Sequence, residues 1–483
     1  MVVKGKKVTL LFLKLVAFSI PFQVFALPVS GKGIETGHLF FTLALVFLLR
    51  DFVLKDGRAA GLDAPERYLL LFLGGAVISF AIGFHLFQFM GHEIKGIKQL
   101  AGLFEAASVF FVIHRSVSTP DEFSGMVRFL VAGMGCLAFS GLWQFLAMNF
   151  TGIRLLADWS WAQGLNPSLG AGWRRCGEMG GLYRAHSFAP EPAQYAMMLT
   201  SIIGLTIIRI FPHKGFQRSG WKDLLPSLAL CMGTVLAYIL SFSLLAIVSL
   251  MVIIAAYGGL FFEKKHSVIT GALFILVLFG IWTAMNTATE GKIAQKMITI
   301  KMIMPTGDKD ITSDALSALA LASNLEVGLK ALKANPFTGW GIGGHPFAFA
   351  QYAPVWTARY PILLKLCKED AGSLGIRLIS ETGLIGLSLF LLFIWGIIRR
   401  ALHAIKEAEK KASASAAPLV PLCIGLLIST IGVVIRVLFR YGSYYSLVFW
   451  VSLGLTSTIP QVLSSCPEAV NVPFIRGCDD GTN

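Results

Sequence analysis

Residues 184–210 read RAHSFAPEPAQYAMMLTSIIGLTIIRI, and this stretch decides the fold. It opens with an arginine, a histidine and a glutamate and continues as an apolar run of about 20 residues, the length of a helix that crosses a bilayer. The same succession of polar connection and apolar run recurs between residues 8 and 458. We therefore expect an all-α polytopic membrane protein that forms a single membrane domain over residues 1–483.

The composition excludes an ordinary soluble enzyme. The chain has 483 residues, of which 55% are hydrophobic and 14% charged, and its mean hydropathy is +0.70. A soluble domain has about 25% charged residues. The net charge of +14 lies largely in short connections, where lysine and arginine hold helix ends on the cytoplasmic side of a membrane. It therefore gives no reason to expect a nucleic-acid partner.

The hydropathy pattern predicts about twelve membrane spans. The N-terminal run follows three lysines, as in a signal peptide, but no convincing cleavage site follows it, so we expect it to be the first span. The predicted spans lie near residues 8–27, 38–53, 68–88, 97–114, 125–148, 193–210, 224–241, 243–262, 267–285, 376–398, 418–438 and 441–458.

The distribution of lysine and arginine orients these spans, because basic connections stay in the cytoplasm. With the spans above, the basic connections all fall on one side: the N-terminus, 54–67, 211–222, 263–266 and 399–417. Both termini are then cytoplasmic, including the polar tail 460–483. The two long polar segments, 149–192 and 286–375, fall on the outer face.

The seven cysteines contain no CxxC pair, so neither a zinc site nor a disulfide framework is indicated. Only Cys176 and Cys367 fall in the predicted outer segments. A bridge between them is one alternative, and two separate thiols are the other.

The second outer segment contains an amphipathic helix in the prediction. Asn324 can cap a helix that runs to about Lys333, with leucines along one face, and the following asparagine, proline and glycine end it. The glycine-rich turn at 339–344 resembles a phosphate-binding loop only superficially. No strand precedes it and no Lys-Ser/Thr pair follows it, so we reject a P-loop.

The first outer segment ends in the strongest candidate site. Arg184, His186 and Glu191 lie within eight residues at the start of a span. A guanidinium group matches the paired oxygens of a diphosphate, while the imidazole and the carboxylate are candidate bases. The alternative is an ordinary helix start with an arginine that reaches the membrane surface.

Further candidates lie near the outer ends of later spans. Arg377 and Glu381 are one helical turn apart, and an arginine at membrane depth usually faces an interior or a water-filled cavity. The sequence favours Glu381 as an orienting or structural partner over a base. The remaining candidates are Arg436 and Arg440 as cavity-lining cations, and His345 and Arg359 in the second outer segment.

The order of these features resembles the bacterial O-antigen ligase and polymerase superfamily, which comprises Wzy-type polymerases and WaaL-type ligases. Three motifs carry the resemblance, which covers about residues 180–400: RAHSFAPEPAQYA at 184–196, NPFTGWGIGG at 335–344 and SETGLIGL at 380–387. The ligase branch has a His-Asn-type pair about nine residues before the glutamate of the last motif. This chain has no histidine there, which favours a polymerase. The chain departs from the family at two further places. The family often has a basic residue where this chain has Ser323 and Asn324, and it often has a Ser-Arg pair where this chain has Ser243 and Leu244.

The resemblance implies a GT-C-like glycosyltransferase that joins undecaprenyl-diphosphate-linked glycan units at the periplasmic face of the bacterial inner membrane. It also implies a chain-length regulator and a flippase as partners. A diphosphate leaving group needs fixed cations more than a protonating acid. Arg184, Arg377, Arg359, Arg436 and Arg440 are the expected cations, and the candidate bases for the acceptor hydroxyl are Glu191, His186 and His345. An in-line displacement would invert the anomeric centre.

We expect no metal and no cofactor. The acidic residues nearest to a cluster in the outer segments are Asp308, Asp310 and Asp314, and they resemble a solvated loop more than a calcium site. Two rival functions stay open. A ligase that moves glycan to lipid A-core or protein would share the fold, and a transporter or flippase for an anionic lipid or sugar would also place arginines in a membrane cavity.

Overall fold

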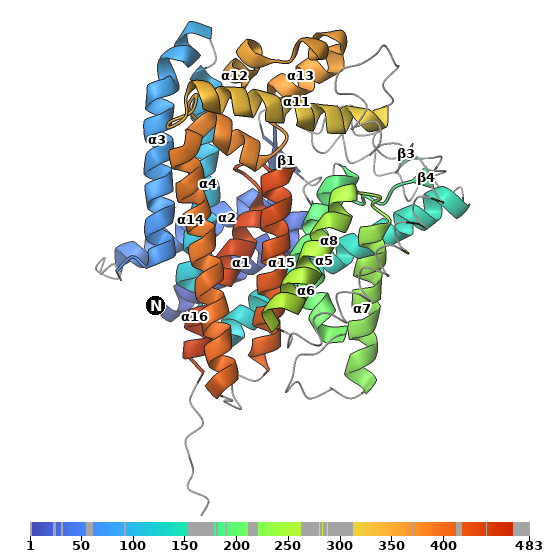
Figure 1. The fold of residues 1–483 in the computed structure, drawn as a ribbon. Coiled ribbons are helices and arrows are strands. Elements are labelled where there is room, and N and C mark those ends of the chain that lie inside the picture. Colours follow the sequence, from blue (N-terminus) through green and yellow to red (C-terminus); the bar gives the residue numbers. More distant parts are fainter. Residues whose placement is uncertain are drawn as a thin grey trace, which may run out of the picture.

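The structure is a computed structural model (Figure 1). It describes residues 2–22, 26–29, 32–54, 61–90, 93–151, 178–179, 182–189, 191–210, 221–261, 280, 283, 287, 313–369, 371–411, 418–440 and 442–466.

Eight α-helices lie in the described part of the first half of the chain, and most of them follow the predicted spans. They are α1 (Val2–Ser19), α2 (Thr36–Leu54), α3 (Ala64–Met90), α4 (Glu93–Ser116), α5 (Pro120–Leu146), α6 (Pro192–Ile210), α7 (Trp221–Ile239) and α8 (Leu244–Phe261). The first predicted span, 8–27, is wrong in its bounds, because its helix covers residues 2–19 and a strand begins at residue 26. A 3-10 turn, η1 (Ile20–Phe22), follows α1, and a π-helical turn, η2 (Ala147–Thr151), follows α5. The described strands form two short antiparallel hairpins, β1 (Ala26–Val29) with β2 (Lys32–Glu35) and β3 (Glu178–Met179) with β4 (Leu182–Tyr183).

The second half of the described chain contains six helices and a 3-10 turn. They are α11 (Ser313–Ala334), α12 (His345–Tyr352), η5 (Val355–Arg359), α13 (Pro361–Glu369), α14 (Leu374–Lys411), α15 (Leu419–Phe439) and α16 (Leu447–Ser464). The predicted spans 376–398, 418–438 and 441–458 thus correspond to helices, whereas the predicted span 267–285 lies outside the described residues apart from 280 and 283.

Six of the described helices are long and apolar enough to cross a membrane, which identifies a membrane protein. Four shorter apolar helices accompany them, at Gly37–Phe47, Pro192–Ile208, Leu228–Ile239 and Leu245–Phe261. The total of about twelve spans stays a prediction. The six candidate spans are Ala64–Phe84, Gly96–Ser116, Pro120–Thr151, Leu374–Lys411, Leu419–Phe439 and Leu447–Ser464.

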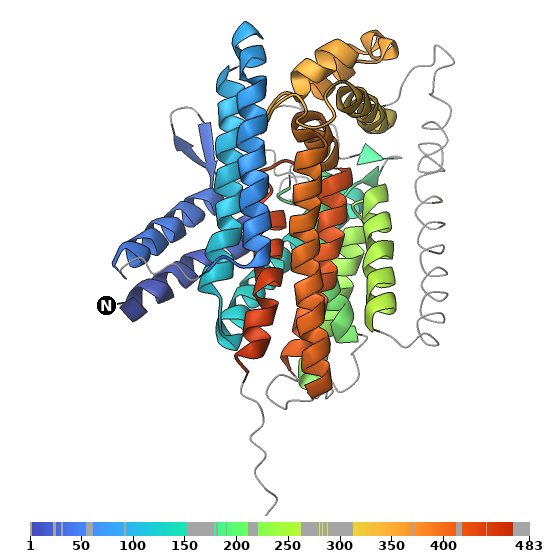
Figure 2. The ribbon, with the colours of Figure 1, turned by 60° about the vertical axis from the view of Figure 1, so that its left-hand side comes forward.

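The helices form an upright bundle with α15 near its centre. α15 packs against α6, α8, α14 and α16. A Cβ atom at Gly204 of α6 would lie only 2.4 Å from the carbonyl oxygen of Gly425 in α15, so the two backbones touch. Small residues allow this approach, and association of helices within a membrane depends on such packing. α1 and α2 run obliquely at one side of the bundle (Figure 2).

The helices α11, α12 and α13 lie across one end of the bundle (Figures 1 and 2). We call residues 313–369 the cap and this end the cap end. The hairpin β3–β4 also lies toward this end, whereas α14 ends at the opposite end (Figure 1). The described parts of the two long polar segments therefore share one end of the molecule, as the sequence predicts.

The structure corrects the predicted boundaries of the cap helix. α11 begins at Ser313, so Asn324 lies in its middle instead of capping its start. The stretch that precedes it, SDALSALALAS, is rich in alanine and leucine, which favour a helix. Asn324 is buried, and its side chain is used for a tertiary contact.

The structure also corrects the expectation of a continuous span at 376–398. Inside α14, Gly383 has φ 61° and ψ −159°, so a short helical segment before it and a long one after it meet at a kink. This combination of angles is open essentially only to glycine. The short segment contains Arg377, Ser380 and Glu381, and it lies under the cap.

Candidate functional site

The glycine-rich segment 336–341 fills the break in α14. The N–H groups of Trp340 and Gly341 donate to the carbonyl oxygens of Ser380 and Glu381, each at 2.9 Å. In the opposite direction, Leu384 donates to Pro336 at 2.8 Å and Ile385 donates to Phe337 at 3.2 Å. Every buried backbone group needs a partner, above all at membrane depth. The segment therefore replaces the hydrogen bonds that the helix loses at Gly383.

Only glycine allows the two segments to lie this close. Gly339 has φ 64°, and a Cβ atom there would lie 2.5 Å from the carbonyl carbon of Glu381. A Cβ atom at Gly383 would lie 2.6 Å from the carbonyl oxygen of Phe337. The hydroxyl of Ser79 in α3 lies 2.7 Å from the carbonyl oxygens of both Thr338 and Glu381. Three segments distant in sequence are thus joined at one point.

A buried pair of opposite charges lies beside the break. Glu381 is fully buried and Arg377 is 5% exposed, and the two side chains attract each other electrostatically. The guanidinium carbon of Arg377 also lies 5.7 Å from the ring centre of Tyr444, a cation–π contact. Burial raises the pKa of the Tyr444 hydroxyl well above its ordinary value, and the Glu381 carboxylate raises it further. Tyr444 is therefore neutral at physiological pH.

The Glu381 carboxylate has unused hydrogen-bonding capacity. The N–H groups of Gly343 and His345 and the hydroxyl of Tyr444 face it. Among the described residues, however, none of them reaches hydrogen-bonding geometry with either carboxylate oxygen. Burying a charge without such bonds is costly. An incompletely bonded, buried ionisable group in a membrane protein indicates a functional position more than a stabilising one.

His345 is held in a buried network that joins three helices. One ring nitrogen, Nδ1, lies 3.2 Å from the hydroxyl of Ser380, and the other, Nε2, lies 3.3 Å from the side-chain oxygen of Asn324. These contacts connect α11, the start of α12 and the short segment of α14. Both ring nitrogens are engaged, so the geometry favours His345 as a positioning residue over the predicted role of base.

Two of the predicted arginines converge on one turn. The turn between α7 and α8, residues 240–243, accepts hydrogen bonds from Arg184, whose Nε is 3.0 Å from the carbonyl oxygen of Ser241 and whose Nη2 is 3.4 Å from that of Phe242. Arg436, in the last turn of α15, approaches the two helices that flank this turn, with Nη1 3.4 Å from the hydroxyls of both Tyr238 and Ser249.

Arg436 also links this turn to the start of α6. Its Nη2 donates to the carbonyl oxygen of Ala193 at 2.8 Å. These bonds all go to neutral oxygens, which orient the two guanidinium groups. Arg436 is 2% exposed and Arg184 is half-buried. Two permanent cations are therefore fixed at the cap end among apolar helices, an arrangement suited to an anion.

The turn between Arg184 and α6 carries the predicted bases. His186 lies with Nε2 3.2 Å from the side-chain nitrogen of Gln144 and Nδ1 3.3 Å from the carbonyl oxygen of Ala189. The side-chain oxygen of Gln144 accepts from the N–H groups of both His186 and Ser187. Ser187 has φ 50°, and backbone strain of this kind concentrates at functional sites.

Glu191 lies at the end of the same turn. It is half-buried, two residues before the carbonyl oxygen that Arg436 contacts. Within the described part of the chain its carboxylate forms no hydrogen bond or ion pair that competes with a substrate. Of the three predicted bases, Glu191 is the carboxylate, and it lies two residues before the backbone group that Arg436 contacts.

The other predicted cations lie apart from this turn. Arg359 is exposed at the end of η5 in the cap, and Arg440 is half-exposed directly after α15. Arg377 lies over the ring of Tyr444 and interacts electrostatically with Glu381, and a site shared with Arg184 stays a prediction. Cys367 is buried with its thiol 3.7 Å from the carbonyl oxygen of Ala320, whereas Cys176 lies outside the described residues. The bridge between them is thus untested, and so are the loop aspartates 308 and 310.

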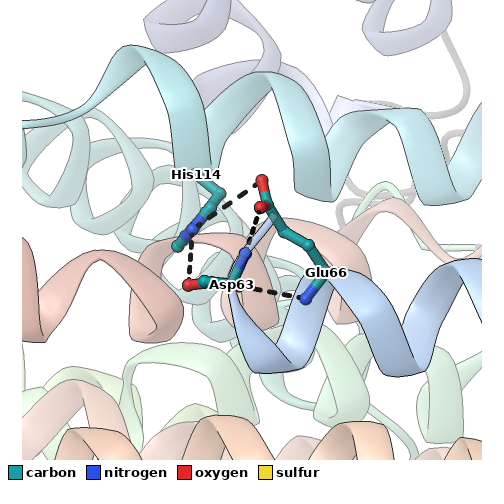
Figure 3. Close-up of side chains that lie close together, drawn as sticks. All are labelled: Asp63, Glu66 and His114. Atoms are coloured by element: carbon teal, nitrogen blue, oxygen red, sulfur yellow. Dashed lines mark hydrogen bonds and ion pairs between the residues drawn. The ribbon is translucent and has the colours of Figure 1, made fainter. Parts of the chain in front are cut away.

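A second, partly buried group of charges lies where α3 begins, away from the cap (Figure 1), and Figure 3 shows three of its side chains. Asp63 and Glu66, at the start of α3, approach His114 of α4, whose Nε2 lies 3.1 Å from Asp63 and 4.0 Å from Glu66. Both Nε and Nη2 of Arg115 donate to Glu66, at 2.5 and 2.6 Å. Arg400 of α14 donates to Asp63. We call these five residues the lower ion cluster.

The lower ion cluster contains residue types that commonly bind metal ions, but its carboxylates already accept hydrogen bonds from arginines. Ligand atoms of Asp63, Glu66 and His114 lie within 4.8 Å of one another. The two carboxylates, however, accept from two arginines. Partial burial raises the pKa of Asp63, but hydrogen bonds from His114 and Arg400 outweigh this and hold it well below its usual range. The geometry favours a structural ion network.

Sequence reasoning missed several residues of the cap-end site. Gln144, Asn324, Ser380 and Tyr444 were not expected to contact it, because their partners come from other helices and leave no local signal. Glu381 was assigned only an orienting or structural role. The signal in the sequence that could have identified Glu381 as a functional residue was its spacing of four residues from Arg377. No protein-family model and no curated protein sequence matches this chain.

Proposed function

We propose that this protein is a polymerase-type glycosyltransferase that joins glycan units carried on a polyprenyl diphosphate. The observation that carries the proposal is the pair Arg184 and Arg436. These residues come from distant segments, yet they are fixed around one turn at the end of a membrane bundle that also bears the polar segments. A lipid-linked diphosphate is the anion expected to meet cations at the end of a membrane bundle.

The proposed chemistry follows from the charge of the leaving group. The diphosphate oxygen that leaves the anomeric carbon gains negative charge as the bond breaks. Preorganised cations stabilise this charge, and they need no reorganisation during the reaction. Arg184 and Arg436 supply the cations, since each guanidinium group is already oriented by backbone or hydroxyl oxygens. No protonating acid is required, because the departing diphosphate is a stable anion.

Glu191 is the proposed base. The acceptor hydroxyl must lose its proton as it attacks the anomeric carbon, and a nearby carboxylate can take it. Gln144, His186 and Ser187 hold the turn that ends at Glu191, so we assign them a positioning role. Attack opposite the leaving group inverts the anomeric centre. The cap and the Arg377–Glu381 pair would shape the acceptor side of the site.

Replacement of Glu191 tests this assignment. Glu191→Gln should lower glycan transfer by about 100-fold or more, in keeping with the loss of a general base, while Glu191→Asp should retain part of the activity. Glu326→Gln is the matched control, because Glu326 is an exposed glutamate of the cap that pairs with Lys330. Equal activity in the Glu191→Gln variant and the control would refute the role of Glu191.

Polymerase and ligase differ only in the acceptor, so glycan profiling of a deletion strain distinguishes them. For a polymerase, the ladder of long glycans should disappear while a single repeat unit is still transferred. Full-length lipid-linked glycans that stay untransferred would identify a ligase. Accumulation of lipid-linked units that never reach the outer face would favour the flippase alternative and contradict the proposal.

A further inference from the structure

We propose that the groove between α3 and the lower half of α14 binds an anionic phospholipid of the adjacent membrane leaflet. The groove has a volume of about 620 Å³. It lies toward the end of the bundle opposite the cap, beside the lower ion cluster. Ala64 and Tyr68 of α3 form one wall, one face of α14 forms the other, and Pro460 of α16 also lines it. The inference is independent of the proposed enzymatic function.

The α14 wall of the groove is apolar in its upper part. Leu392 and Trp395 line it together with Gly396, and the Trp395 side chain is 60% exposed. Tyr68 faces them from α3. Tryptophan and tyrosine are enriched where hydrocarbon meets the lipid headgroups, because their rings are apolar with one polar atom. This part of the groove suits acyl chains.

The same face of α14 becomes basic one turn after Trp395. Arg399, His403 and Lys406 follow Trp395 at spacings of three or four residues, so they share its side of the helix. All three are exposed. Among the described residues neither Arg399 nor Lys406 forms an ion pair, and the acids nearby have other partners: Asp63 binds Arg400 and Glu407 binds Lys410. The lower groove therefore keeps an excess of positive charge.

The order of these side chains selects the ligand. An apolar upper part and a cationic lower part on one helix face correspond to the acyl chains and the phosphate of one phospholipid molecule. Basic pockets between membrane helices recognise anionic headgroups, and each lysine or arginine near the surface contributes to the attraction. A free phosphate ion would use only the lower part. The described part of the basic connection 399–417 contains all three of these basic side chains.

The test is lipid binding by the full-length protein in mild detergent. The shift of the unfolding temperature is titrated with phosphatidylglycerol and, separately, with phosphatidylcholine, and retained lipid is measured by native mass spectrometry. Arg399→Gln/Lys406→Gln removes the groove cations. Lys365→Gln/Lys368→Gln is the control, since it removes the same charge from two exposed lysines of the cap, outside the groove.

We expect phosphatidylglycerol to bind the unchanged protein more tightly than phosphatidylcholine. The groove variant should bind phosphatidylglycerol about 30-fold more weakly, because the loss of each cation should weaken binding by a factor of about ten or less. The control should bind it less than about 3-fold more weakly. Equal affinity for both lipids, equal losses in both variants, or displacement of the lipid by millimolar inorganic phosphate would overturn the proposal. If the groove variant does not fold, the unchanged protein still tests the proposal. Its preference for phosphatidylglycerol over phosphatidylcholine must weaken as the salt concentration rises, and a preference that is independent of salt would overturn the proposal.

Discussion

The Arg377–Glu381 pair and the lower ion cluster each contain a fully buried glutamate and involve α14, yet they are built differently. In the lower ion cluster, Glu66 accepts two short hydrogen bonds from Arg115, and Asp63 accepts from Arg400. At the cap end, the Glu381 carboxylate is as deeply buried but has no partner in bonding geometry among the described residues.

This difference separates stability from function. A buried charge that is fully hydrogen-bonded has no bonding capacity left for a substrate, and removing one partner destabilises the fold. A buried charge with unused capacity costs stability, and it is retained where it takes part in a reaction or holds a reacting group. We therefore expect substitutions at the cap end to change activity and substitutions in the lower ion cluster to change stability.

The largest expected effect is on glycan transfer. Arg184→Ala should lower the rate by about 100- to 1,000-fold, as the loss of one preorganised charge donor does, while the protein still inserts and elutes as a single species. Arg184→Lys should restore little, because an ammonium group does not reproduce the planar guanidinium. Arg67→Ala, at an exposed arginine of α3, is the control. Full activity of Arg184→Ala would leave Arg184 as a surface anchor.

The coupling of Arg184 with Arg377 shows whether the cap-end site is one site. If both arginines contact one diphosphate, the double alanine variant should be little worse than the poorer single variant. Arg184 and Arg377 have different contacts in the structure, so non-additive losses would be strong evidence for a shared site. Strictly additive losses in the transfer assay would separate the Arg377–Glu381 pair from the diphosphate.

The next effect is on stability at the opposite end. Glu66→Ala removes two charge-assisted hydrogen bonds and should lower the free energy of unfolding by about 2–3 kcal/mol, because the Arg115 left behind is 34% exposed and can still be solvated. Thermal unfolding in detergent measures this. Transfer activity at a temperature where the variant is folded should stay within about 3-fold of the unchanged protein. A large loss of activity without a loss of stability would show that the lower ion cluster serves the reaction instead of the stability of the fold.

A smaller loss is expected at the break in α14. Gly383→Ala places a side chain at φ 61° and ψ −159°, which costs about 1–3 kcal/mol in backbone strain, and directs the new Cβ at the carbonyl oxygen of Phe337. Gly396→Ala is the control, because a Cβ atom there would meet only ordinary contacts. Unlike Glu66→Ala, Gly383→Ala should also lower activity. If Gly383→Ala changed neither the free energy of unfolding nor the transfer activity, the kink at Gly383 would not be required for either.

No effect is expected from removal of divalent metal ions. The proposed reaction relies on arginines, and the carboxylates of Asp63 and Glu66 are bonded to arginines. Excess EDTA should therefore change neither the transfer activity nor the unfolding temperature. Activity restored by Mg²⁺ or Mn²⁺ would overturn the arginine mechanism at the cap end. A lowered unfolding temperature would make the lower ion cluster a metal centre.

The sequence was a good guide to the helices and a poor guide to the contacts between them. The apolar runs predicted α3 to α8 and α14 to α16 because burial in lipid requires long apolar helices, whatever their neighbours. Asn324 shows the limit. Its residue type and its position before leucines match a helix cap, but its partner, His345, lies in another helix. Likewise, the motifs at 335–344 and 380–387 were read as separate features, and no local pattern shows that they bond to each other.

The break in α14 has a consequence for how the protein is made. A chain emerges from the ribosome in sequence order, so residues 336–341 are synthesised before residues 380–385, whose backbone groups they bond. The partner of the kink is therefore present when the kink forms, and α14 never has to expose opened backbone groups to lipid. A chimera that receives α14 from this protein without residues 336–341 should insert it as a straight helix, with Glu381 moved away from the cap.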